Sequence, residues 1–255
     1  MNENLQRIEW LDIAKGIGII FVVIGHAGIS GIGNIIYLFH MPLFFYISGY
    51  LYKKQLNIVK YIKDKSIQLL IPYFFLLFIF IPANGLSDLL NNTSMQLNDI
   101  VHFILRIVSG GKNIAGATTV FWFITCLYLT QIIYNTLQNI FKLKSINYIA
   151  FSMLILGYLI SYIISDINIP WNADVVLVAL PIYHLGYLSK NINFNINKYI
   201  VYILALISIF LAIYVPNISF NMKDSYYGIP VLSIICALII ISFIKIISIN
   251  ISNYN

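Results

Sequence analysis

A histidine, a lysine and an aspartate share one face of the first long apolar segment of the chain. Lys15 and His26 are eleven residues apart. That spacing is close to three helical turns, so both side chains project from nearly the same face, about 16 Å apart along the axis. Asp12 lies within about 40° of that face. An imidazole can move protons or acyl groups at neutral pH, and an ionisable side chain inside a membrane-length helix marks a functional site by default. We therefore expect an elongated anionic ligand, with its charged end near Lys15 and its reactive end near His26.

The same residues also fit a purely structural role. Asp12 and Lys15 could form an i, i+3 pair on the surface of a helix. His26 could be an interior histidine whose hydrogen bonds are satisfied. Spacing alone leaves both interpretations open.

Polar residues in the next apolar segment favour the active-site interpretation. His40 precedes Pro42, which removes a backbone donor and distorts a helix locally. Ser48 and Gly49 follow, and Gly49 permits another backbone to approach closely. A proline-kinked aromatic helix with a small-residue contact and a histidine bonded to its neighbour would explain each feature singly. Two histidines on adjacent helices of a hairpin are harder to explain in that way, so we expect His40, Ser48 and Gly49 to line the site.

The elements that must position these residues are membrane helices. Apolar residues make up 60% of the 255-residue chain and charged residues only 9%, against about 25% charged in soluble domains. Apolar runs long enough to cross a bilayer recur along the whole sequence. The sequence predicts one all-α, polytopic membrane domain over residues 1–255 with about eight spans, near 16–34, 35–52, 67–84, 119–140, 146–165, 173–189, 199–216 and 228–249.

The basic residues predict the orientation of these spans. With a cytoplasmic N-terminus, twelve of the fifteen lysines and arginines fall in inner segments, among them the loop 53–66. The outer segments hold Arg106, Lys112 and Lys223. This distribution obeys the positive-inside rule. The net charge of +6 is therefore a topology signal, and the dispersed lysines exclude a nucleic-acid footprint.

Several smaller signals have two readings each. His184, in the sixth span, could face the same cavity or be a structural histidine. Trp122 could line the substrate site or anchor the fourth span at the interface. Asp174 could touch a sugar acceptor, or it could cap a helix or lie on the surface. Cys126 and Cys236 fall within spans and predict no disulfide, and no cluster of residues has metal-ligand spacing.

The motifs together resemble integral-membrane acyltransferase family 3, and more closely its branch of surface-polysaccharide O-acetyltransferases, the fucose 4-O-acetylase-like proteins. The specific matches are RIEWLDIAKGIGI (7–19), VVIGH (22–26), FHMPLFF (39–45) and SGYL (48–51). Weaker ones are LIPYF (70–74), FWFI (121–124) and LPIYHLGY (180–187). The resemblance thus touches most of the chain, and its specific part is the first fifty or so residues.

This resemblance implies transfer of an acetyl or other acyl group from cytoplasmic acyl-CoA to a hydroxyl of a cell-surface or exported glycan, or of a lipid-linked sugar, without a metal. It implies that His26 is the general base or acyl relay and that Asp12 orients its partners. Donor phosphates would meet Arg7, Lys15, Lys63 and Lys65. A bacterial-type cytoplasmic membrane is the implied location.

Three departures from the family pattern are visible. The family places arginine where Lys15 stands, and lysine offers a point charge instead of a bidentate fork. The family also carries paired arginines before the third helix, where this chain has Lys63, Lys65 and Gln68. The chain is in addition shorter than the family's usual ten or so spans, which suggests a C-terminal truncation.

A rival function is a secondary transporter or exporter of polar solutes that uses His26 and His40 as a proton relay. It predicts symmetry between two halves, and the sequence shows none. A third possibility is an inactive, truncated membrane protein. The crowding of polar groups into the first two spans favours the acyltransferase.

Overall fold

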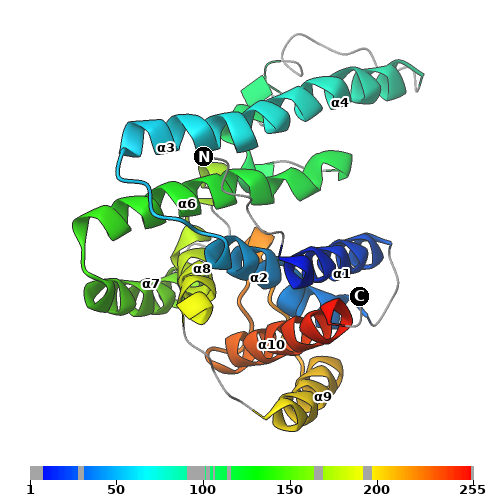
Figure 1. Ribbon diagram of the computed structural model, residues 1–255. Helices are drawn as coiled ribbons and strands as arrows, with labels where there is room; N and C mark the ends of the chain where they lie inside the picture. Colours follow the sequence, from blue (N-terminus) through cyan, green and yellow to red (C-terminus); the bar gives the residue numbers. More distant parts are fainter. Residues whose placement is uncertain are drawn as a thin grey trace. The chain divides into compact units, whose positions relative to one another are not determined.

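The computed structural model describes residues 8–27, 32–90, 101, 104–105, 107–113, 116–163, 169–191 and 197–253. Most of these residues are helical (Figure 1), and an isolated bridge joins Asn221 to Tyr226. The all-α prediction is confirmed, and each predicted apolar segment contains a helix. The α-helices are α1 (Glu9–His26), α2 (Gly33–Tyr50), α3 (Ile58–Lys65), α4 (Ile71–Leu90), α6 (Trp122–Ile140), α7 (Leu143–Ile163), α8 (Val176–Asn191), α9 (Lys198–Tyr214) and α10 (Leu232–Ser252).

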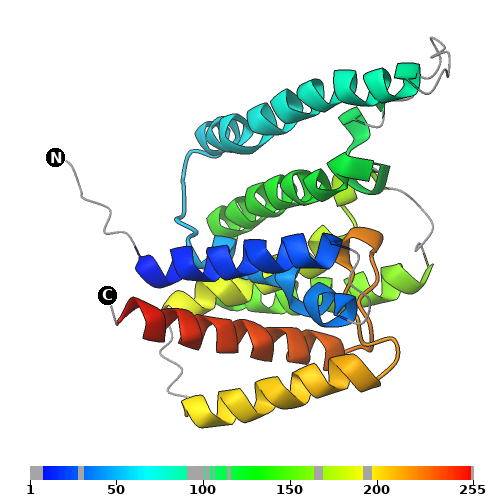
Figure 2. The same cartoon turned by 90° about the vertical axis from the view of Figure 1, so that its right-hand side faces the viewer.

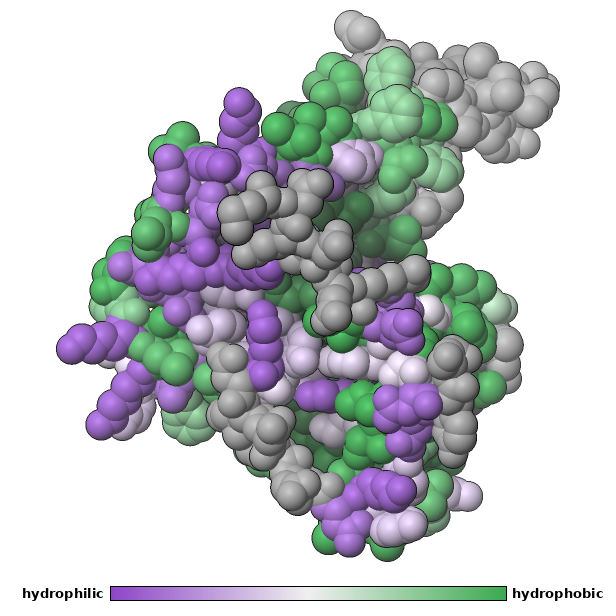
Figure 3. Space-filling view, viewed as in Figure 1, coloured by the Kyte–Doolittle hydropathy of each residue, from purple (hydrophilic) through white to green (hydrophobic). Residues whose placement is uncertain are grey.

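Apolar residues cover the outer sides of several helices. Three helical stretches of the described chain are long and apolar enough to cross a membrane, namely Thr118–Ile140, Leu143–Ile163 and Leu232–Ser252, and α9 is apolar but shorter. The described side chains of α4, residues 71–80, form a largely apolar surface (Figure 3), with exposed aromatic side chains such as Phe75 and Phe78. Helices suit this environment because they satisfy their backbone hydrogen bonds internally.

The chain forms two compact units. The first comprises Met1–Tyr52, Ile182–Met222 and Tyr226–Asn255, and it therefore holds α1, α2, α9, α10 and most of α8. Within it, α1 packs against α2 and α10, and α9 packs against α10 (Figure 2). The buried side of α1 carries Leu11, Ala14 and Gly18 at helical spacing. Gly18 lies against the Phe44 ring of α2, so small residues let the two helices approach closely.

The first helix differs from its predicted span. Its run begins at Glu9 and ends at His26, whereas hydropathy placed it at 16–34. Acidic residues in a first turn favour helix initiation, and hydropathy does not register that preference. The sequence that follows is rich in glycine, which has a low helix propensity. As a result His26 still belongs to the helix, but as the last residue of α1 and not near the middle of the predicted span.

The second unit, Lys53–Pro181 with Lys223–Ser225, contains α3, α4, α6, α7 and the first turns of α8. The segment predicted as the basic loop 53–66 is partly helical. The Asn57 side chain caps α3 by accepting the Lys60 backbone N–H at 2.9 Å. A π-helical stretch, Ser66–Leu70, connects α3 to α4. Asn135 of α6 fixes the start of the segment through two 3.0 Å hydrogen bonds with the Gln55 backbone.

Candidate active site

Asp12 and Lys15 form an ion pair on the exposed side of α1. Lys15 Nζ lies 3.4 Å from Asp12 Oδ1, and the side chains are 38% (Asp12) and 39% (Lys15) exposed. This is the i, i+3 pair that the structural interpretation anticipated. The same side of the helix carries Ile19 and Val23, which are 57% and 64% exposed, and it ends at the exposed His26. The face is therefore open along its length, as an elongated ligand would require.

The two histidines of the α1–α2 hairpin come together around Tyr37. The Tyr37 ring centroid lies 6.4 Å from the His26 ring and 5.3 Å from the His40 ring. The Tyr37 hydroxyl donates to the Gly25 carbonyl at 3.4 Å, a long hydrogen bond. His40 is buried and His26 is exposed, so His26 is the imidazole that a ligand can reach. Sequence reasoning missed Tyr37, whose only signal was its place in the hairpin.

Each imidazole is held by the carbonyl one turn before it. His26 Nδ1 lies 2.8 Å from the Val22 carbonyl oxygen, and His40 Nδ1 lies 2.8 Å from that of Ile36. A carbonyl can only accept, so Nδ1 must carry the proton and Nε2 is the basic nitrogen. The helix backbone thus fixes both ring orientation and tautomer, and it leaves His26 Nε2 available to take a proton.

Gly49 and Gly186 form a close crossing between α2 and α8. A β-carbon on Gly49 would lie 1.8 Å from the Tyr183 carbonyl oxygen, and one on Gly186 would lie 2.0 Å from that of Tyr46. The close approach expected at Gly49 is therefore present. Ser48 adjoins this crossing, and the buried His184 ring stacks near Tyr187 with centroids 6.4 Å apart. Ser48 and His184 belong to the same compact unit as His26.

Lys245 is a basic residue of α10 that lies beside the N-terminal end of α1. The sequence indicated only a role in membrane topology for this residue. Its Nζ lies 5.4 Å from the ring centroids of both Trp10 and Tyr50. These rings meet edge to face, 5.1 Å apart. A lysine in an apolar run can be read as a topology marker, so its ring contacts were not visible in the sequence.

The remaining predicted donor and lining residues either belong to the second unit or fall outside the described residues. Arg7 falls outside the described residues. Lys63 and Lys65 are on α3 of the second unit, where Lys65 donates to Gln68 at 3.2 Å. Burial lowers the pKa of the Lys65 ammonium, and neighbouring Asp64 opposes that shift. Trp122 begins α6 in the same unit and is buried. Cys126 and Cys236 are both buried and unbridged, as predicted.

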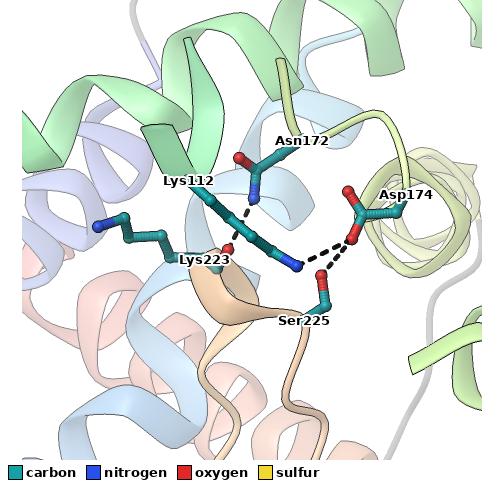
Figure 4. A network of polar contacts seen from close by, with 5 residues as sticks. All are labelled: Lys112, Asn172, Asp174, Lys223 and Ser225. Atoms are coloured by element: carbon teal, nitrogen blue, oxygen red, sulfur yellow. Dashed lines mark hydrogen bonds and ion pairs between the residues drawn. The ribbon is translucent and has the colours of Figure 1, made fainter. Parts of the chain in front are cut away.

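Asp174 is the centre of a buried polar network in the second unit (Figure 4). Its Oδ2 lies 3.4 Å from Lys112 Nζ, with both side chains 6% exposed, and it accepts a hydrogen bond from the Ser225 hydroxyl. Asn172 joins by donating to the Lys223 carbonyl at 2.8 Å. Because the Asp174 side chain is buried, the surface role considered for it is not supported.

Comparisons with known proteins place the sequence among acyltransferases. The chain matches a family model described as "Acyltransferase domain" over residues 8–252. The Nodulation protein NolL of Sinorhizobium fredii (strain NBRC 101917 / NGR234) is 39% identical over 79 residues, which cover 25% of this chain and 22% of that protein. The chain therefore matches less than a quarter of that relative's length. No solved structure matches the chain.

Proposed function

We propose that this chain, which belongs to acyltransferase family 3 because the family model covers residues 8–252, is an integral membrane O-acyltransferase that moves an acetyl group from cytoplasmic acetyl-CoA to a hydroxyl of a cell-surface or exported glycan. The observation that carries the proposal is the open face of α1. It bears a cation at Lys15 and, about 16 Å further along, an exposed imidazole whose Nε2 is free to act as a base. A bacterial-type cytoplasmic membrane is the proposed location.

In the proposed reaction His26 acts as a general base. Its Nε2 takes the proton of the acceptor hydroxyl while the hydroxyl oxygen attacks the thioester carbonyl carbon of the donor. The carbon–sulfur bond then breaks, and the imidazolium returns the proton to the departing thiolate. The products are an acetyl ester and free CoA. The Val22 carbonyl supports this role because it accepts a hydrogen bond from the Nδ1–H group and stabilises the imidazolium that forms.

Tyr37 is placed to assist the same step. The thioester oxygen gains negative charge during attack and needs a hydrogen-bond donor. The Tyr37 ring lies beside both imidazoles, and its hydroxyl makes a 3.4 Å hydrogen bond to the Gly25 carbonyl. Exchanging that long bond for one to the developing oxyanion would cost little. His40, whose ring lies 5.3 Å from the Tyr37 ring, would then hold that ring in position.

The test is acetyl transfer in membranes supplied with labelled acetyl-CoA. His26→Ala should lower the rate of label incorporation into the glycan fraction by at least about 100-fold, the lower range for a general base. Val23→Ala is the matched control, because Val23 lies about one turn earlier on the same exposed side. Both variants should reach the membrane in wild-type amounts. Wild-type incorporation by His26→Ala would refute the assignment.

A further inference from the structure

Two aromatic rings hold the ammonium of Lys245 at one end of the first unit. Trp10 comes from the first turn of α1, Tyr50 is the last residue of α2, and Lys245 comes from α10. The ring planes stand at 82° to each other, so they form a corner, and Nζ lies 5.4 Å from each centroid. Cation–π contacts of this kind fix the position of an ammonium group.

The position of Lys245 within α10 is unusual for a lysine. α10 is long and apolar enough to cross a membrane, and Lys245 stands seven residues before its last residue, Ser252, or about 10 Å along the axis. Among the residues that the structure describes, no carboxylate pairs with this ammonium, since the ion pairs are Asp12–Lys15 and Lys112–Asp174. A charge so placed marks a functional site by default.

The surroundings suggest which ligand the ammonium meets. Trp10 precedes Lys15 by five residues on α1, about 7.5 Å along the axis. Two ammonium groups therefore flank the first turns of the helix whose other end carries His26. This is the end at which the donor's charged portion is expected, and acyl-CoA carries its negative charge in its phosphates. Lysine binds phosphate well as a point charge.

We propose that Lys245, held between Trp10 and Tyr50, binds a phosphate group of the acyl-CoA donor and acts together with Lys15. This inference rests on the proposed function. The competing explanation is that Lys245 is a topology-determining lysine whose long stem lies along the apolar surface. The two explanations differ in one measurable respect. Only the phosphate-binding role predicts that replacing Lys245 changes the KM for a donor with phosphates and leaves the KM for a donor without them unchanged.

The experiment compares acetyl-CoA with S-acetylpantetheine, which presents the same thioester without phosphates. Lys245→Met should raise the KM for acetyl-CoA about tenfold or more, the loss expected for one charged hydrogen bond. It should leave the KM for S-acetylpantetheine unchanged, and Lys245→Arg should retain most of the acetyl-CoA affinity. Lys198→Met is the matched control. Lys198 begins α9 and also lies over an aromatic ring, 5.5 Å from the Tyr199 centroid, so its KM values should stay at wild type.

An unchanged KM for acetyl-CoA, or an equal rise for both donors, would overturn the inference in favour of a structural lysine. A binding measurement separates this inference from the proposed reaction. CoA should raise the melting temperature of the purified wild-type protein more than pantetheine does, whether or not acetyl transfer is detected. Lys245→Met should abolish that difference, and its persistence in the variant would overturn the inference.

Discussion

Replacing Gly49 with alanine tests whether the α2–α8 crossing positions the candidate active site. A β-carbon at Gly49 would lie 1.8 Å from the Tyr183 carbonyl oxygen, whereas real β-carbons essentially never come within 3.0 Å of a neighbouring atom. The helices must therefore separate by the difference, about 1.2 Å. The obstructing atom belongs to the backbone, so no rotamer change can relieve the clash. We expect a loss of stability near the upper end of the range for overpacking, about 3 kcal/mol.

The assay is the melting temperature of the detergent-solubilised protein, followed by the acetyl-transfer rate at a temperature where the variant is folded. A loss of about 3 kcal/mol corresponds to a fall of about 6–12 °C for a chain of this size. The separation of α2 from α8 would also displace Ser48 relative to His184. Displacements of about 1 Å can lower rates about 100-fold, so activity should fall even in folded protein.

Gly16→Ala is the matched control for this prediction. Gly16 lies on α1, and a β-carbon there would meet nothing within 4 Å. Alanine favours a helix over glycine by up to about 1 kcal/mol, so this variant should melt at or above the wild-type temperature. The reasoning fails if Gly49→Ala melts together with Gly16→Ala.

Two further predictions concern the other polar clusters. Tyr37→Phe keeps the ring between the two imidazoles but removes the hydroxyl, so kcat should fall about 100-fold if that hydroxyl stabilises the oxyanion, with little change in the KM for acetyl-CoA; an unchanged kcat would rule out that role. Lys112→Met leaves the buried Asp174 carboxylate without its cation and should cost about 3–5 kcal/mol in unfolding free energy. The double variant with Asp174→Leu should recover part of that loss in melting experiments, and strictly additive losses would contradict the ion-pair explanation.

The sequence predicted the helices well, because length and hydropathy alone decide whether an apolar run forms a membrane-type helix. It misplaced the ends of α1, since hydropathy is blind to the acidic first turn and to the glycines after His26. It took α3 for a loop because lysines look the same in a solvated loop and on a short amphipathic helix. These errors concern boundaries and leave the order of the elements unchanged.

The candidate site was predicted where its residues are close in sequence. Lys15 and His26 lie on one helix, so helical spacing was enough to relate them, and His40 follows on the adjacent helix of the same hairpin. Lys245 could not be related to Trp10, because that contact joins opposite ends of the chain through tertiary packing. Asp174 is a similar case, since Lys112 and Ser225 reach it from 62 and 51 residues away. Contacts over such separations leave no periodic trace in a sequence.

The α1 helix is continuous from Glu9 to His26, so it fixes the distance between Lys15 and His26. The rise per residue sets the axial distance between the ammonium and the imidazole, and the number of residues per turn places both side chains on the same face of the helix. One residue inserted between Lys15 and His26 would turn His26 by about 100°, whereas four would bring it back to within about 40° of its original direction but increase the axial distance by about 6 Å. A donor that binds along this face must therefore have a matching distance between its charged group and its thioester. The geometry of the helix thus becomes a source of substrate selectivity.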